Sequence, residues 1–232
     1  MIPLLSQDPE SPFPAVELAL ENPRGLLAAG GDLSVTRLVN AYRHGIFPWY
    51  SEDEPILWWS PSPRCVLYPE RVHISRRLRR RYNQGAFSVT ADRAFAQVIE
   101  ACAKARGNAG GTWITKEMQD AYILLHATGI AHSLEVWRGG ELAGGVYGLA
   151  LGPVFFGESM FSRVNDASKV ALVALCRQMM QWEFTLLDCQ VSNPHLLSMG
   201  AEEVSRAEFQ QHLNNTDGAD HWQQDFHAAP RW

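Results

Sequence analysis

Two carboxylates lie inside segments that are otherwise mostly apolar. Glu158 interrupts the run Phe155–Phe161, and Asp188 comes near the end of Leu186–Gln190. Burying an unpaired carboxylate costs on the order of several kcal/mol, so each placement requires a reason. Alternation along a strand predicts that Asp188 and Gln190 share one face. A reactive site is one interpretation. The other is that Asp188 only satisfies the backbone amides of a loop.

A second group of residues concentrates positive charge. Six arginines fall between Arg71 and Arg81, and no acid interrupts residues 71–90, although the chain has a net charge of −5. An acidic protein with a local basic cluster commonly binds a polyanion there. Flat indole rings stack on bases, and the cluster has aromatic residues before and after it in the sequence: Trp49, Tyr50, Trp58, Trp59 and Trp113. This set indicates a single-stranded RNA end. A solvated basic helix face is the alternative.

Composition excludes several other functions. The chain has 232 residues and no apolar run long enough to cross a membrane, and residues 1–14 do not resemble a signal peptide. Its four cysteines are scattered without a C-x-x-C pair, which predicts reduced thiols, a cytosolic protein and no zinc site. The spacing of the histidines fits no metal-binding motif, so we expect His126 and His132 to be structural.

The first part of the chain is rich in Pro, Gly and Trp. Ser34 is predicted to cap a helix that stops at Gly45, and short strands are predicted over 56–59 and 65–68. Ser75 could cap the helix that carries the arginines. We place the end of a small N-terminal domain at residue 62.

The remainder, 63–232, reads as a larger domain. Asp92 and Thr115 are predicted to cap two helices that end near Ala105 and Gly129. A tail that is loosely packed is expected after Thr216. Strands are predicted over 132–137, 141–150, 154–161 and 185–189, with a crossover helix over 167–182. This order predicts a mixed α/β (α+β) fold.

Many short motifs along the chain occur in the same order as in one known family. They include Gly45-Ile46-Phe47-Pro48-Trp49, Ile56-Leu57-Trp58-Trp59-Ser60-Pro61, Arg64, His73-Ile74-Ser75-Arg76, Gly111-Thr112-Trp113-Ile114-Thr115, Gly144-Gly145-Val146-Tyr147-Gly148, Gly157 to Arg163, Ala167-Ser168-Lys169 and Asp188-Cys189-Gln190. With these motifs the sequence closely resembles the bacterial leucyl/phenylalanyl-tRNA–protein transferases. The resemblance runs from about Phe13 to Ala201.

The resemblance implies an aminoacyltransferase. Such an enzyme moves leucine or phenylalanine, and methionine as a further candidate, from aminoacyl-tRNA to the α-amino group of a protein that begins with Arg or Lys. The product is marked for degradation in the cytoplasm. The donor ester is already activated, so no ATP, metal or other cofactor is expected. A C-terminal domain similar to acyl-CoA N-acyltransferases is implied as well. We expect a monomer, because no helix shows a sustained apolar seam beyond core needs.

The resemblance also assigns roles to residues. Asp188 would orient and polarise Gln190, whose side-chain oxygen would accept a hydrogen bond from the attacking amine, and Glu158 would hold the terminal adenosine or the aminoacyl amine. Stacking on the terminal adenosine would fall to Trp49 and Trp113. The pocket for the aminoacyl side chain would include Val146, Gly157, Met160, Leu175 and Leu187, with Met160 equally suited to a plain core position. The acceptor-stem phosphates would be bound by Arg76, Arg77, Arg79, Arg80 and Arg81.

Two other functions compete with this one. An acyl-CoA-dependent N-acetyltransferase would need a glycine-containing pyrophosphate loop before the crossover helix. Here that junction, 162–167, contains no glycine and includes Asp166. An RNA-binding module without catalysis would explain the arginines and tryptophans, but it would leave Glu158, Asp188 and Gln190 without a role.

Overall fold

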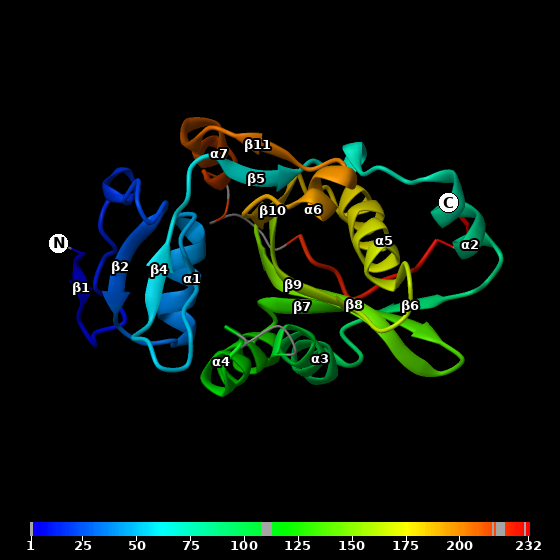
Figure 1. Ribbon diagram of the computed structural model, residues 1–232, viewed down its shortest axis with the longest axis horizontal. Coiled ribbons are helices and arrows are strands. Elements are labelled where there is room, and N and C mark those ends of the chain that lie inside the picture. The colour runs from blue at the N-terminus through cyan, green and yellow to red at the C-terminus, as the bar shows by residue number, and fades with distance from the viewer. Residues whose placement is uncertain (1, 108–112, 215, 217–220, 230) are drawn as a thin grey trace.

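The structure is a computed structural model that describes residues 2–107, 113–214, 216, 221–229 and 231–232. It has two sheets, a small one near the N-terminus and a large one formed by the rest of the chain (Figure 1). The mixed α/β class predicted from the sequence is confirmed. Among the described residues, no helix is both long and apolar enough to cross a membrane.

The small sheet has the strand order β1-β2-β4-β3. Its strands are β1 (Leu4–Leu5), β2 (Leu26–Gly30), β3 (Phe47–Pro48) and β4 (Leu57–Trp59), and the short 3₁₀ helix η1 spans Val16–Leu18. Helix α1 (Val35–Arg43) begins as predicted, because the Ser34 hydroxyl accepts a hydrogen bond from the backbone N–H of Arg37. The chain leaves this helix at Gly45, whose φ of +73° suits glycine.

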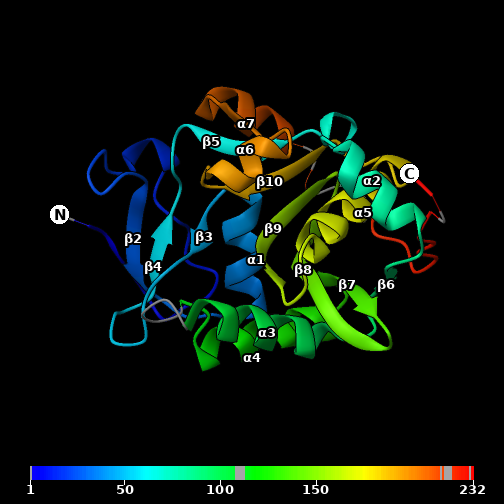
Figure 2. The same cartoon turned by 45° about the vertical axis from the view of Figure 1, so that its right-hand side comes forward.

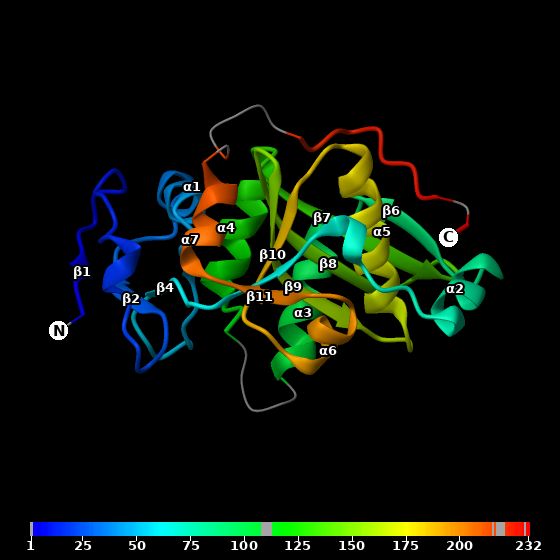
Figure 3. The same cartoon turned by 90° about the horizontal axis from the view of Figure 1, so that it is seen from above.

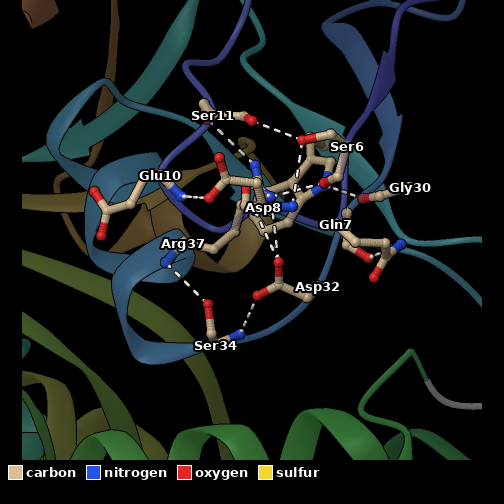
Figure 4. Close-up of polar contacts among 11 residues, drawn as sticks. Ser6, Gln7, Asp8, Glu10, Ser11, Gly30, Asp32, Ser34 and Arg37 are labelled. Carbon is tan, nitrogen blue, oxygen red and sulfur yellow. Dashed lines mark hydrogen bonds and ion pairs between the residues drawn. The ribbon is translucent and has the colours of Figure 1, made fainter.

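Arg37 joins α1 to the N-terminal segment. Its guanidinium is fully buried and donates to the carbonyl oxygens of Ser6, Asp8 and Ser11 (Figure 4). The Asp32 carboxylate accepts two further bonds, from Nε and Nη2 of the same side chain. A buried guanidinium needs this degree of satisfaction, so removing Arg37 would release the segment from the helix.

The large sheet has the order β11-β5-β10-β9-β8-β7-β6. Its strands are β5 (Arg64–Leu67), β6 (Ser88–Ala91), β7 (Ala131–Arg138), β8 (Glu141–Leu151), β9 (Val154–Ser162), β10 (Leu186–Gln190) and β11 (Glu202–Val204). Antiparallel pairing joins β7, β8 and β9, whereas β10 returns parallel to β9 through the crossover helix α5 (Ala167–Gln181). The hairpins and the crossover are confirmed. The strands change sheet between Trp59 and Arg64, and the division into domains at residue 62 stays a prediction.

Helices cover both faces of the large sheet. Helices α3 (Phe95–Gly107) and α4 (Lys116–Ala127) pack on one face, and α5 packs on the other (Figures 1 and 2). Helix α2 (Arg76–Asn83) begins at Ser75, as predicted, and lies beside α5 at the end away from the small sheet. The remaining elements are η2 (Pro69–Arg71), α6 (Pro194–Ser198) and α7 (Arg206–Leu213).

Two predictions about local structure are wrong. The carboxylate of Asp92 does not cap α3. It accepts the backbone N–H of Ser133, while Glu135 of β7 accepts the N–H of Ala94 at the start of that helix. The C-terminal tail is not loosely packed where it is described, since Trp222 is buried and stacks on His132 with 4.1 Å between ring centroids. Figure 3 shows the tail running along the large sheet.

Candidate active site

A cavity of about 440 Å³ opens between the small sheet and the large one. Strands β8, β9 and β10, helix α5 and the segment around α6 form its walls, and β3 with Trp49 closes one side. The site residues predicted from the sequence that line it are Trp49, Trp113, Val146, Gly157, Glu158, Met160, Leu187 and Gln190. A separate groove of about 800 Å³ lies between the N-terminal segment, α1 and α7 and contains none of them.

Glu158 is held by three donors. The phenol of Tyr42 on α1 donates to Oε1 at 2.6 Å, and the phenol of Tyr122 on α4 donates to Oε2 at 3.1 Å. The side-chain amide of Gln190 donates to Oε1 at 2.7 Å. Burial raises the pKa of this carboxyl to about 7, although the three hydrogen bonds oppose the rise. Glu158 therefore changes charge near neutral pH.

Asp188 has a different environment. It is fully buried, and Arg64 of β5 grips it with two bonds, Nε to Oδ1 at 2.9 Å and Nη2 to Oδ2 at 2.7 Å. The same guanidinium donates to the carbonyl oxygen of Gly45 at 3.1 Å. Two parallel bonds to a carboxylate are strong and directional. Asp188 thus has a cationic partner that is equally buried.

The regular alternation predicted for β10 breaks between Asp188 and Gln190. The strand pairs Asp188 with Val66 but Gln190 with Cys65, so Cys189 forms a bulge. Gln190 has a φ of +62°, which is uncommon for a residue other than glycine. Its backbone N–H donates to Asp188 Oδ1 at 2.9 Å, so Asp188 holds Gln190 through the main chain. The strand is therefore not regular at this point, and Gln190 lines the cavity whereas Asp188 does not.

This geometry leaves one atom of Gln190 available. Its Nε2 is committed to Glu158, and within the described part of the chain no hydrogen bond reaches its Oε1. An amide oxygen at a cavity wall can accept a hydrogen bond from an amine. The arrangement can therefore position a nucleophile beside a group whose charge titrates near neutrality.

Most of the predicted apolar pocket is brought together. Val146 and Met160 come from paired positions on β8 and β9, and Leu187 comes from β10. Gly157 lies where an added Cβ would come within 3.4 Å of Leu187. Leu175 is fully buried in α5 and does not line the cavity. Leu172, one turn earlier on the same helix, does.

The comparison with protein families is decisive. Residues 66–214 match the model of the leucyl/phenylalanyl-tRNA protein transferase, and residues 31–62 match the model of its N-terminal domain. The chain belongs to this family. The leucyl/phenylalanyl-tRNA–protein transferase of Stutzerimonas stutzeri is 55% identical over 95% of this chain and 99% of its own length. That of Pseudomonas entomophila is 59% identical over 87% and 89%.

Likeness to solved structures is much weaker. A GCN5-related N-acetyltransferase from Kribbella flavida has a TM-score of 0.39 and 11% identity, covering 71% of this chain and 58% of its own. A score this low does not establish a shared fold. The assignment to the transferase family, and with it to the aminoacyltransferases, rests on sequence.

Only some of the arginines predicted to bind tRNA are unpaired in this transferase family member. Arg76, Arg79 and Arg80 are exposed on α2, and no described acid pairs with them. Arg77 and Arg81 instead contact the carboxylate of Asp166, at 3.3 and 2.9 Å. These pairs hold the pKa of Asp166 below its usual value against the opposing effect of burial. An acid paired in this way, at the start of α5, is unsuited to binding a pyrophosphate.

Three residues of the site were not predicted. Arg64, Tyr42 and Tyr122 hold the two carboxylates, and all three are buried. An arginine between Pro63 and the apolar segment 65–67 is the one local signal, since a buried guanidinium implies a buried acid. Tyrosines on amphipathic helices have no comparable signal in the sequence.

The two histidines considered structural lie together. His126, His132 and Asp92 each offer a ligand atom, and these atoms lie within 4.8 Å of one another. Both nitrogens of His132 are already in contact with oxygen atoms, Nδ1 with Asp92 at 2.8 Å and Nε2 with the carbonyl of Gly129 at 3.0 Å. Trp222 Nε1 donates to the same carboxylate at 2.9 Å. A metal ion here would have to displace these contacts.

Proposed function

We propose that this protein transfers leucine or phenylalanine, and also methionine, from aminoacyl-tRNA to the α-amino group of proteins that begin with Arg or Lys. One observation carries the proposal in a chain of this family. Glu158 and Gln190, joined by a 2.7 Å hydrogen bond, lie in a cavity that has an apolar wall and two tryptophans at its lining.

The reaction is an aminolysis of an ester. The amine nitrogen of the acceptor attacks the carbonyl carbon of the aminoacyl ester, a C–N bond forms, and the C–O bond to the terminal ribose breaks. The amine loses a proton, and the ribose oxygen leaves as a hydroxyl. Because the ester is already activated, positioning supplies much of the rate, up to roughly 7–11 kcal/mol of the barrier.

Each polar group has a part in this step. Gln190 Oε1 accepts a hydrogen bond from the attacking amine, and Asp188 acts as a positioning residue because it holds the backbone of Gln190 at 2.9 Å. Glu158 faces the same space and, when ionised, favours a cationic acceptor. Arg64 holds the Asp188 carboxylate in a buried ion pair at the end of β10. A neutral amide is a poor base, so the proton passes to the leaving oxygen or to water.

The rest of the cavity selects the donor. Val146, Met160 and Leu187 would contact the aminoacyl side chain, and Trp49, which is 43% exposed, would stack on the terminal adenosine together with Trp113. A difference of one methylene in such a pocket is worth only about 1–3 kcal/mol, which fits the use of three amino acids. Leu175 would act from behind this wall.

Binding of tRNA would extend to α2. Its exposed arginines would contact acceptor-stem phosphates without reading sequence, while Arg77 and Arg81 would exchange Asp166 for phosphate. We further propose that the protein acts as a monomer in the cytoplasm, with a domain division near residue 62, and that its products are marked for degradation.

A transfer assay tests the proposal. Labelled leucyl-tRNA is incubated, without ATP or CoA, with a model protein beginning with Arg and with the same protein beginning with Ser. Label on the Arg protein alone supports both the reaction and the acceptor rule. If tRNA binds but no label is transferred, the chain is an RNA-binding module and the proposed reaction is wrong.

A further inference from the structure

One side chain at the cavity has a polar atom with no partner. His195 of α6 lines the cavity beside Gln190 and Asn193. Its Nε2 is buried, and no described atom makes a hydrogen bond with it. A buried unsatisfied ring nitrogen costs free energy that a bound group can recover, so this atom indicates a ligand contact.

A positive charge lies near this atom. Burial lowers the pKa of His195, and the positive charge of the Lys169 ammonium on α5 lowers it further. Lys169 is partly exposed, and no carboxylate in the described ranges pairs with it. It lies three residues before Leu172, which lines the cavity, and residues so spaced share one face of a helix.

These residues continue a line of positive charge from α2. Asp166, which begins α5, contacts Arg77 and Arg81 of α2 at 3.3 and 2.9 Å. Lys169 lies one turn further along α5, and His195 then lines the cavity itself. Along α5 the order is therefore Asp166 beside the arginines, then Lys169, then Leu172 at the cavity, which His195 also lines. A chain of phosphates that enters the cavity from α2 would follow this order.

We propose that Lys169 and His195 bind the phosphate that joins the terminal adenosine of the donor tRNA to the preceding nucleotide. The proposal rests on the proposed function. A phosphodiester is the anionic group of the donor next to the adenosine, and an ammonium with an imidazole N–H suits it as a point charge and a directed donor. The acceptor amine is a cation, and Lys169 would repel it.

Three donors separate this role from a general effect on the cavity. They are the leucyl ester of adenosine, which has no phosphate, the leucyl ester of cytidylyl-adenosine, which has this one phosphate, and leucyl-tRNA. We expect Lys169→Ala and His195→Ala each to raise KM about tenfold for the second and third donors, since a charge-assisted hydrogen bond is lost. With the adenosine ester, KM and kcat should stay at the wild-type values.

Two controls accompany these variants. Lys104→Ala removes an exposed lysine of α3 that pairs with Glu100, and it should leave KM and kcat unchanged for all three donors. Arg79→Ala on α2 should raise KM for leucyl-tRNA and leave KM for the two shorter donors unchanged. His195→Gln and Lys169→Gln keep most of the side-chain volume. Melting temperatures of all variants close to the wild-type value would show that a higher KM does not come from misfolding.

Several results would overturn the proposal. Equal losses with all three donors would mean that the residues only shape the cavity, and no loss with any donor would mean that neither residue contacts the phosphate. If the wild-type protein transfers from none of the donors, the proposed function fails. Binding of cytidylyl-adenosine alone then decides the site, because Lys169→Ala must weaken it about tenfold if the phosphate binds there.

Discussion

Two carboxylates, Asp188 and Glu158, are buried close together on the large sheet, and they have different hydrogen-bond donors. Asp188 receives a guanidinium with two parallel bonds, and it is fully buried. Glu158 receives only neutral donors, two phenols and an amide. Hydrogen bonds without a counter-charge do not offset the cost of burial, so the pKa of Glu158 rises to about 7. One carboxylate thus has a buried counter-charge, and the other, with a pKa of about 7, changes charge near neutral pH.

We propose that this difference separates a positioning residue, Asp188, from a residue that takes part in proton chemistry, Glu158. Asp188 does not line the cavity, and it acts on Gln190 through the backbone. Glu158 lines the cavity and accepts a hydrogen bond from the side chain of Gln190. Substitutions at Asp188 and at Glu158 should therefore differ in their effects on stability, on the rate of transfer and on its pH dependence.

Replacing Asp188 by Ala should have the largest effect. It leaves Arg64 buried without its partner, which costs about 3–5 kcal/mol of stability, and it frees the backbone of Gln190. We expect transfer to fall about 1000-fold, while tRNA binding persists. Urea unfolding and single-turnover transfer measure the two effects. In Asp188→Leu with Arg64→Met the stability should return and transfer should not. Recovery of transfer in the double variant would contradict a positioning role.

Replacing Glu158 by Gln should lower transfer about 100-fold with little change in fold, because the amide keeps the shape and its single oxygen still accepts from one of the two phenols. The wild-type rate should show a pH dependence with a midpoint near 7, where the Glu158 carboxyl titrates. The variant should lose that dependence. A midpoint that stays in place in Glu158→Gln would assign the titration to another group.

Stability should depend on pH through the same carboxyl. Its pKa is about 7 in the folded protein, against an ordinary value of 4.5. The folded state therefore keeps a proton that the unfolded state has lost. This contribution is fully present below about pH 4.5 and is lost as pH rises through about 7, which amounts to about 3 kcal/mol. Urea unfolding across this range should show a decline in wild type that is reduced in Glu158→Gln.

The smallest effect concerns the phenols. Tyr122 donates to Glu158 and opposes the rise in its pKa. Tyr122→Phe should therefore move the midpoint of the rate profile upward by about one unit. Tyr68→Phe is the matched control, since that phenol donates to Glu208 outside the cavity. A downward shift in Tyr122→Phe would mean that the phenol stabilises the protonated acid.

Local patterns predicted much of the fold. Ser34, Ser75 and Thr115 cap helices as expected, and the hairpins turn at glycines. These features depend on residues within a few positions of one another. The cap of α3 was missed because its acceptor, Glu135, is 41 residues away from Ala94. The bulge at Cys189 was missed for a similar reason, since it depends on pairing with β5.

The candidate site was predicted in part. Glu158, Asp188 and Gln190 stood out because polar side chains interrupt apolar strands. Their partners did not, since Tyr42 is 116 residues from Glu158 and Arg64 is 124 residues from Asp188. Such contacts arise only when α1 and β5 pack against the large sheet. The identity of a buried acid is visible in a sequence, but the group that sets its charge is not.

The hydrogen bonds of the buried Arg37 side chain have a consequence for folding cooperativity. Helix α1 carries Arg37, which binds the N-terminal segment (Figure 4). Five residues later it carries Tyr42, which donates to Glu158. One helix therefore connects the anchoring of the first residues with the environment of Glu158. Local unfolding of the N-terminal segment would loosen α1 and withdraw a donor from Glu158. The N-terminal segment and α1 would then exchange backbone hydrogen with solvent together, and activity would be lost before the large sheet unfolds.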